Sequence, residues 1–246
     1  MNGSKVKRLT VPAIVSRFGI DGVDSGMRLT LADLEPKQRH AWLTPLIAPR
    51  PIAFVSTLSA AGIGNLSPFS FFVMGGQNPQ SIAFCPVADR DGNPKDTLRN
   101  VLETGEFVVN VVSYEMAERA NATSAPYPPD VDEFDAVGLT RAPSTVVKPP
   151  RVAESPAQLE CRVFQTVQHG SGPQHSTWVI GEVLVLHVND AVIGEDGLPD
   201  TALVHPAARM GRQEWAHVNS ENMFILVRPT SVPEGGKPAP RKTLGM

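Results

Sequence analysis

RPIAFVSTLSAAGIGNLSPFSFF, residues 50–72, contains the strongest β-sheet signal in the chain. Residues 51–58 (PIAFVSTL) are rich in Ile, Phe, Val and Thr, which is the composition of a strand. Residues 59–64 (SAAGIG) predict a tight turn, and residues 65–74 (NLSPFSFFVM) predict a second strand. Pro68 should break or bulge that second strand, because proline has no N–H to donate to a sheet ladder.

Further short strands are predicted along the rest of the chain. Apolar runs rich in β-branched residues mark residues 81–85, 106–112, 158–168 and 176–188, and residues 203–218 end the core. Helical patterns are short and lie at residues 29–43, 97–104 and 114–122, the first of them amphipathic. A chain with six or more short strands and a few short helices predicts a mainly β fold, an antiparallel barrel.

Composition divides the chain into three predicted parts. Residues 1–44 form an N-terminal extension, residues 45–218 form the core domain, and residues 219–246 form a C-terminal extension rich in Pro, Gly and Lys. Inside the core domain, residues 123–150 are rich in proline and predict a long irregular excursion over the surface.

Charge and composition exclude several classes of partner. The net charge of -3 leaves no basic excess to neutralise the phosphates of a nucleic acid or an anionic membrane. The sequence contains no apolar stretch of 18 residues, so no membrane span is predicted. The apolar run near the N-terminus is too short for the core of a signal peptide. The two cysteines, Cys85 and Cys161, lie far apart in strand-like runs, which favours free thiols and a cytoplasmic location.

The strand pair of residues 50–72 mixes polar and aromatic side chains. Alternation places Phe54 and Ser56 on one face of the first strand, and Val55 and Thr57 on the other. Backbone groups freed near Pro68 and flanked by aromatic rings could read the edge of a flat heterocycle by hydrogen bonds and stacking. A polar strand pair with a bulge would show the same residues.

Residues 95–97, Lys-Asp-Thr, precede a short helical pattern that stops at Gly105. Asp96 fits the N-cap position and Gly105 fits the C′ position. The free N–H groups and the positive dipole end of such a helix attract anions, and Lys95 adds a full charge, which suits a phosphate monoester. An ordinary capped helix with a solvated lysine would look the same. Taken together with the strand pair, the motif predicts a ligand with a flat ring and a phosphate tail.

Other motifs do not predict a site. Gly62-x-Gly64-x-x-Ser67 does not open a helix, as a dinucleotide-binding loop must. The six histidines show no metal-ligand spacing, so no metal is expected. Cys85 has no basic neighbour except Arg90 to activate a thiolate, and the serines lack the nucleophile-elbow pattern of a hydrolase.

The strand pair, the Lys-Asp-Thr motif and a late His205-Pro206-x-x-Arg209-x-Gly211 resemble the flavin reductase-like, FMN-binding split-barrel family over about residues 45–218. Members include flavoredoxins and the reductase components of two-component monooxygenases. The resemblance implies a split β-barrel with a few short helices and a homodimer. It also implies FMN, or FAD, bound near the dimer interface and reduced by NADH or NADPH.

The resemblance also implies roles for particular residues. The isoalloxazine ring and ribityl chain would be surrounded by Ser56, Thr57, Asn65, Ser67, Pro68, Phe69 and Ser70. The phosphate would be held by Lys95, Asp96 and Thr97. Arg209 would lie near the cofactor, and His205 would be the catalytic residue on the nicotinamide side, in an extended conformation that the following proline favours. A histidine that only satisfies a turn would fit His205 equally well.

The function that these features predict is an FMN-binding, NAD(P)H-dependent flavin reductase that supplies reduced flavin, with a flavin-dependent monooxygenase as the partner that the family suggests. The hydride chemistry belongs to the flavin, and the protein supplies orientation and electrostatics. Two alternatives stay open. One is an FMN-holding electron-transfer protein that never releases its flavin, and the other is a non-catalytic flavin-binding module.

Overall fold

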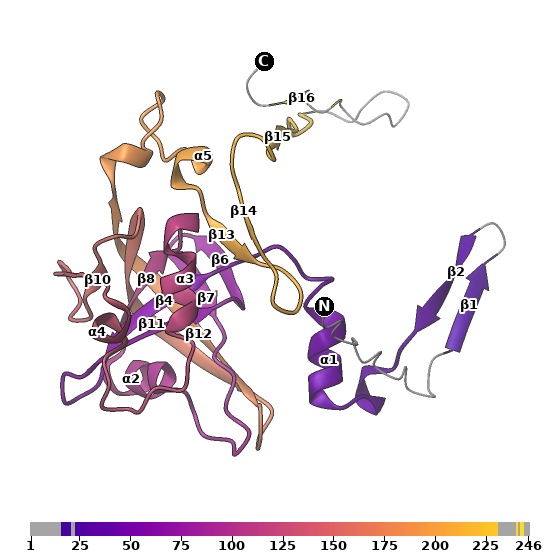
Figure 1. Ribbon diagram of the computed structural model, residues 1–246, viewed down its shortest axis with the longest axis horizontal. Coiled ribbons are helices and arrows are strands. Elements are labelled where there is room, and N and C mark those ends of the chain that lie inside the picture. Colours follow the sequence, from indigo (N-terminus) through magenta and orange to yellow (C-terminus); the bar gives the residue numbers. More distant parts are fainter. Residues whose placement is uncertain (1–15, 21–22, 231–239, 241, 244–246) are drawn as a thin grey trace, which may run out of the picture. The chain divides into compact units, whose positions relative to one another are not determined.

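A computed structural model describes residues 16–20, 23–230, 240 and 242–243 of the chain (Figure 1). The chain divides into two compact units, residues 1–47 and residues 48–246, which are described separately. The expectations for residues 1–15, 21–22, 231–239, 241 and 244–246 fall outside the described residues. Within the described part, no helix is long and apolar enough to cross a membrane.

The first unit contains a β-hairpin and a short helix. Strands β1 (Ser16–Ile20) and β2 (Val23–Arg28) pair antiparallel. A 3-10 turn, η1 (Leu31–Asp33), leads to helix α1 (Pro36–Leu43), whose N-terminus is closed by a capping box between Glu35 and Gln38. The predicted helix is therefore present. None of its residues is buried, however, so the expected amphipathic pattern does not form a buried face.

The second unit is built on a seven-stranded sheet in the order β5-β4-β8-β11-β12-β7-β6, and every pair in it is antiparallel. The strands are β4 (Ala53–Leu58), β5 (Gly64–Phe69), β6 (Phe72–Gln77), β7 (Gln80–Phe84), β8 (Glu106–Val111), β11 (Ala157–His169) and β12 (Ser176–Val188). The predicted mainly β fold with short helices is confirmed, and strands β5 and β6 form the two edges of the sheet.

Strand β4 separates two hydrophobic clusters. Val55 packs in a cluster with Phe84 and Phe107, whereas its neighbour Phe54 packs in a second cluster with Phe134. All five of these side chains are fully buried. The predicted alternation of β4 is therefore confirmed, and both faces of the strand are covered.

Shorter elements surround the sheet. They are β3 (Arg50–Pro51), α2 (Asp96–Thr104), η2 (Tyr114–Met116), α3 (Ala117–Ala122), α4 (Glu133–Val137), β9 (Arg141–Ala142), β10 (Arg151–Val152), η3 (Asp190–Val192), α5 (Thr201–Val204), β13 (Ala207–Arg209), β14 (Trp215–His217), β15 (Phe224–Ile225) and β16 (Lys242–Thr243). Strands β14, β13 and β3 form a small three-stranded sheet, β9 pairs with β10, and β15 pairs with β16.

The predicted break at Pro68 is wrong. Pro68 lies inside β5 and pairs in register with Phe54 of β4. Because β5 is an edge strand, one side of its ladder has no partner strand, and a proline is tolerated there. The chain bends instead at Ser70 and Phe71, between β5 and β6.

The prediction that residues 123–150 form an irregular excursion over the surface is wrong in part: most of the segment is irregular, but it contains helix α4 and strand β9, and some of it is buried. Asp132 is the N-cap residue of α4, and its side chain accepts a hydrogen bond from the Phe134 N–H. Gly138, in the left-handed region, is the C-cap residue. Phe134 is fully buried in the second hydrophobic cluster. The segment is therefore part of the core, and it covers one face of β4.

Candidate functional site

A pocket of about 420 Å³ lies between β5, the start of α2 and the chain that follows α3. Five residues that the sequence assigned to the cofactor line it, namely Asn65, Ser67, Lys95, Asp96 and Thr97. The opposite wall comes from residues 123–127, Pro129 and Glu133. The structure therefore brings the polar end of the strand pair together with the Lys-Asp-Thr motif, although about 30 residues separate them in sequence.

The N-terminus of α2 lines this pocket, and no side chain that the structure describes accepts a hydrogen bond from its first N–H groups. Lys95, not Asp96, is the N-cap residue, and no side chain caps the helix. Asp96 is the first helical residue, and its carboxylate pairs with Arg99 one turn later. Gly105 ends the helix in the left-handed region at φ 71°, as predicted. The first N–H groups of α2 are thus available to a ligand rather than bound to a cap.

A buried polar network connects β5 to α2 and β4. The side-chain oxygen of Asn65 accepts a hydrogen bond from the Thr97 hydroxyl at 2.5 Å and a weaker one from the Thr57 hydroxyl at 3.5 Å. The Thr57 hydroxyl accepts in turn from the Asn100 amide at 3.0 Å. Thr57 is fully buried and does not line the pocket. It contacts Asn65 from the interior of the protein.

Glu133 is a site residue that the sequence analysis missed. Its carboxylate is only 5% exposed. It accepts hydrogen bonds from the Asn65 amide at 2.9 Å and from the Leu66 N–H at 2.8 Å. Burial raises the pKa of Glu133 above its usual range, although the hydrogen bonds oppose this. The signal for its helix was present in Asp132, a good N-cap residue, and in Gly138, a good stop.

The charged residues that line the pocket leave Lys95 as the cation without a carboxylate partner in the described part of the chain. Three carboxylates line the pocket, those of Asp89, Asp96 and Glu133, against the two cations Lys95 and Arg99. Arg99 is engaged by Asp96, and no salt bridge to Lys95 occurs within the described residues. An anionic group in this pocket therefore depends on Lys95 and on the N–H groups of α2.

Ser56 lies on the other face of β4 from Thr57. It is fully buried, and its hydroxyl donates to the Pro150 carbonyl at 2.5 Å. Phe69 belongs to the first hydrophobic cluster, with its ring centroid 5.3 Å from that of Phe84. The structure therefore does not bring Ser56 into the pocket, whereas Pro68 and Ser70 stay partly exposed at the end of β5.

His205 adopts a different conformation from the one predicted. It closes α5 in the left-handed region, with φ 49° and ψ 51°, and its N–H donates to Thr201. The need to end a one-turn helix outweighs the extended preference before proline. The Nδ1 atom of His205 lies 2.8 Å from Glu115 Oε1, and its Nε2 atom lies 2.6 Å from His217 Nδ1.

The His205 cluster also has aromatic neighbours. The ring of Tyr114 stacks on that of His217 with centroids 4.5 Å apart. Arg209 lies on β13, where its guanidinium covers the ring of Trp215 at 5.1 Å and donates to the Arg212 carbonyl. Neither His205 nor Arg209 lines the 420 Å³ pocket.

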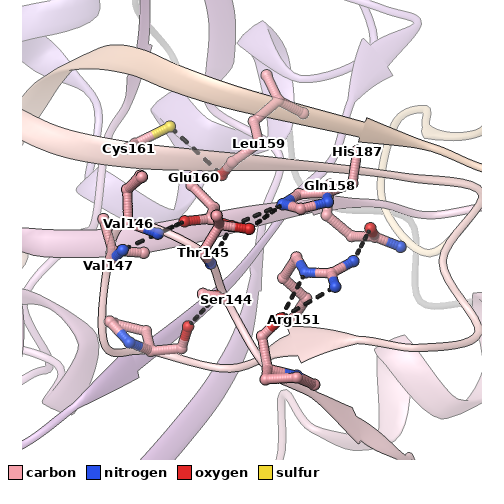
Figure 2. A network of polar contacts seen from close by, with 12 residues as sticks. Ser144, Thr145, Val146, Val147, Arg151, Gln158, Leu159, Glu160, Cys161 and His187 are labelled. Carbon is pink, nitrogen blue, oxygen red and sulfur yellow. Dashed lines mark hydrogen bonds and ion pairs between the residues drawn. The ribbon is translucent and has the colours of Figure 1, made fainter.

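Residues 123–150, which cover one face of β4, form the covering segment. A second buried carboxylate holds its later part, residues 145–147 (Figure 2). Glu160 of β11 is fully buried and accepts hydrogen bonds from the N–H groups of residues 145, 146 and 147 at 2.7, 2.7 and 3.2 Å. His187 Nε2 lies 2.6 Å from the same carboxylate. Burial alone would raise the pKa of Glu160, but these hydrogen bonds outweigh it and lower the pKa to about 2.

Comparison with known proteins identifies the family. The family profile of the flavin reductase like domain matches residues 47–209. The chain belongs to this family. Two relatives are uncharacterised proteins. The one from Halalkalibacterium halodurans is 38% identical over 206 residues, covering 83% of this chain and 97% of the relative. The one from Deinococcus radiodurans is 40% identical over 206 residues, covering 81% and 88%.

Solved structures of the same fold carry more specific names. Nitrilotriacetate monooxygenase component B from Bacillus cereus superposes with a TM-score of 0.77 and 29% identity, covering 83% of this chain and all of that one. The 2-nitrobenzoate 2-nitroreductase of Pseudomonas fluorescens gives a TM-score of 0.75 and 27% identity, covering 85% and 100%. A Shewanella frigidimarina protein described as a putative flavin reductase with a split barrel domain gives a TM-score of 0.69 and 26% identity, covering 84% of this chain and all of that one. The predicted family and split-barrel fold are confirmed.

Replacing Glu160 tests how the covering segment is held. A carboxyl whose folded-state pKa is lowered from 4.5 to about 2 stabilises the fold above about pH 4.5 and loses this contribution as the pH falls towards 2. Glu160→Gln should therefore lower the free energy of unfolding by about 3 kcal/mol at pH 7. Urea unfolding at pH 7 and pH 3 measures this, and the difference from wild type should shrink at the lower pH.

Glu118→Gln is the matched control for Glu160→Gln, because Glu118 is exposed on α3. It should leave the urea midpoint within experimental error of the wild type. A Glu160→Gln protein as stable as this control at pH 7 would contradict the assigned role of the buried carboxylate.

Proposed function

We propose that this protein is an FMN-binding, NAD(P)H-dependent flavin reductase that supplies reduced flavin. One observation carries the proposal. In a chain of the flavin reductase-like family, the pocket beside β5 places Lys95 and the uncapped N-terminus of α2 next to Asn65. That combination suits a phosphate at the end of a hydroxylated tail.

The residues of the pocket divide the work of binding. Lys95 and the first N–H groups of α2 hold the phosphate, while Asp96 keeps Arg99 in place beside them. Ser67, Asn65 and Thr97 lie along the tail. Pro68, Phe69 and Ser70 border the ring at the end of β5, with Thr57 and Ser56 supporting the strand from inside. The bound flavin supplies the hydride chemistry, and the protein orients it.

Two other functions use the same site. An FMN-holding electron-transfer protein would keep its flavin through purification, and a non-catalytic flavin-binding module would oxidise no nicotinamide. The absorption spectrum of the purified protein, before and after anaerobic NADH and NADPH, separates the three. A reductase should catalyse NAD(P)H oxidation that depends on added FMN or FAD. Absence of that oxidation with both nicotinamides would exclude the reductase.

The family features suggest how the parts of the chain are used. We assign flavin binding to residues 45–218, with residues 1–44 and 219–246 as extensions. The similarity to a monooxygenase component B supports a flavin-dependent monooxygenase as the partner that receives reduced flavin. Two free, buried cysteines suit a reducing cytoplasm.

We infer a homodimer from the apolar surface of the sheet. Edge strand β6 exposes Val73 at 50% and Met74 at 67%, and β11 exposes Phe164 at 72%. Unpaired edges and apolar surface of this kind are usually covered in solution. Light scattering of the flavin-loaded protein should give twice the monomer mass at micromolar concentration, and a monomer mass would exclude the dimer.

Replacing Lys95 tests the phosphate site. A hydrogen bond to a charged group contributes about 1.5–3 kcal/mol, so Lys95→Ala should weaken FMN binding by about tenfold to a hundredfold. Riboflavin, which has no phosphate, should bind as it does to wild type. Lys148→Ala removes the same charge at an exposed position outside the pocket and serves as the control. Equal losses of affinity for FMN and riboflavin would show that Lys95 does not bind the phosphate.

Replacing His205 tests the catalytic proposal. If its imidazole donates a hydrogen bond to the nicotinamide or the reduced flavin, His205→Ala should slow flavin reduction by NAD(P)H about tenfold at saturating flavin. FMN affinity should change by no more than a few-fold. Stopped-flow absorbance measures the rate, with His169→Ala, an exposed position at the end of β11, as the control. A wild-type rate would leave His205 with the structural role that its contacts to Glu115 and His217 already give it.

A further inference from the structure

The carboxamide of Asn65 stands at the centre of the proposed site. It is 7% exposed, and it lines both the 420 Å³ pocket and a neighbouring pocket of about 230 Å³. A carboxamide has a donor end and an acceptor end of nearly the same shape, so its orientation decides which of the two a ligand meets. The orientation is therefore a property that the surrounding residues must fix.

Glu133 fixes that orientation. One end of the Asn65 amide faces the hydroxyls of Thr97 and Thr57. The Thr57 hydroxyl, which already accepts from Asn100, has its hydrogen left to donate to that end. The other end faces the Glu133 carboxyl group, which accepts from the rigid Leu66 N–H of β5. The Asn65 group that faces it at 2.9 Å must then be the donor, Nδ2. The Asn65 oxygen consequently faces the Thr97 hydroxyl, which donates to it at 2.5 Å.

One of the two N–H bonds of Asn65 Nδ2 is left over. The amide nitrogen carries two hydrogens, and one of them is directed at Glu133. No second acceptor for this nitrogen is found among the described residues, although the side chain is more than nine-tenths buried. A buried donor without a partner is costly, and a ligand oxygen in the pocket would satisfy it.

We propose that Glu133 is a positioning residue, which holds Asn65 so that its remaining Nδ2 hydrogen is presented to an acceptor oxygen of the ligand. The inference rests on the proposed function, because the ligand it names is FMN. The acceptor is an oxygen of the phosphate or of the ribityl chain, both of which lie in the part of the pocket next to Thr97 and Lys95.

Glu133→Gln should reverse the orientation of Asn65. The new glutamine oxygen would accept from the fixed Leu66 N–H, which turns the new NH₂ group towards Asn65 Nδ2. Two donors cannot pair, so the Asn65 amide would rotate and offer its oxygen to the glutamine. The Thr97 hydroxyl can accept as well as donate, and it accommodates the change. The ligand would then meet an oxygen in place of an N–H.

The test compares flavin affinity with stability. Glu133→Gln should weaken FMN binding about tenfold, measured by titration of flavin fluorescence, whereas the exposed control Glu118→Gln should bind as wild type. Riboflavin identifies the acceptor. A loss confined to FMN places the hydrogen bond on the phosphate, and an equal loss for riboflavin places it on the ribityl chain. Both results support the inference.

A double variant separates positioning from folding. In Asn65→Asp combined with Glu133→Gln, the new carboxylate accepts from the new glutamine and from Thr97, so every internal hydrogen bond is restored and the total charge is that of wild type. Its urea midpoint should return towards wild type, but its affinity for riboflavin and FMN should stay at least tenfold weaker.

The outcomes separate the positioning role of Glu133 from the proposed function. Wild-type FMN affinity in Glu133→Gln would overturn the positioning role while leaving the proposed function intact. Recovery of affinity together with stability in the double variant would show that Glu133 only supports the fold. Failure of the unchanged protein to bind either flavin would overturn the proposed function and this inference with it.

Discussion

The structure depends on burying both faces of strand β4. Its residues from Ala53 to Thr57 are all buried, and each face meets its own hydrophobic cluster. An antiparallel sheet can leave one face in water, so covering the second face requires chain from elsewhere. The segment after β8 provides it by placing Phe134 against Phe54. Earlier in the same segment, residues 123–127, Pro129 and Glu133 line the pocket together with Asn65 and Ser67 of β5.

Two carboxylates, and not apolar contacts alone, hold this covering segment in position. Glu133 is carried by the segment and reaches into β5, whereas Glu160 belongs to β11 and reaches out to residues 145–147. Each accepts backbone N–H groups that have no partner strand to bond. Hydrogen bonds to a buried charge are directional and costly to break, so they set the position of the segment more sharply than side-chain packing would. The site inherits that precision, because Glu133 contacts Asn65.

The sequence predicted correctly those features that depend on neighbouring residues alone. Alternation in residues 51–58 placed Phe54 and Val55 on opposite faces correctly, and Gly105 ended its helix as a left-handed residue should. The errors have long-range causes. Pro68 is tolerated because β5 lies at an edge, which no window of sequence shows. Glu133 receives its hydrogen bonds from residues more than 65 positions earlier in the chain, so a proline-rich stretch gave no sign of its part in the pocket. Motif resemblance supplied the family, but it could not show that Ser56 faces away from the pocket.

The contact between His205 and His217 gives the small sheet a hydrogen-bond chain with a direction. The Glu115 carboxylate only accepts, so the Nδ1 atom of His205 that faces it carries a hydrogen. In a neutral ring the other nitrogen of His205 is then an acceptor, and the Nδ1 atom of His217 must donate to it. The tautomer of a histidine on β14 is thus set by a carboxylate on η2, although no hydrogen bond between those two side chains is found in the described part of the chain. Replacing Glu115 would free both imidazoles to exchange donor and acceptor roles without moving any strand of the small sheet.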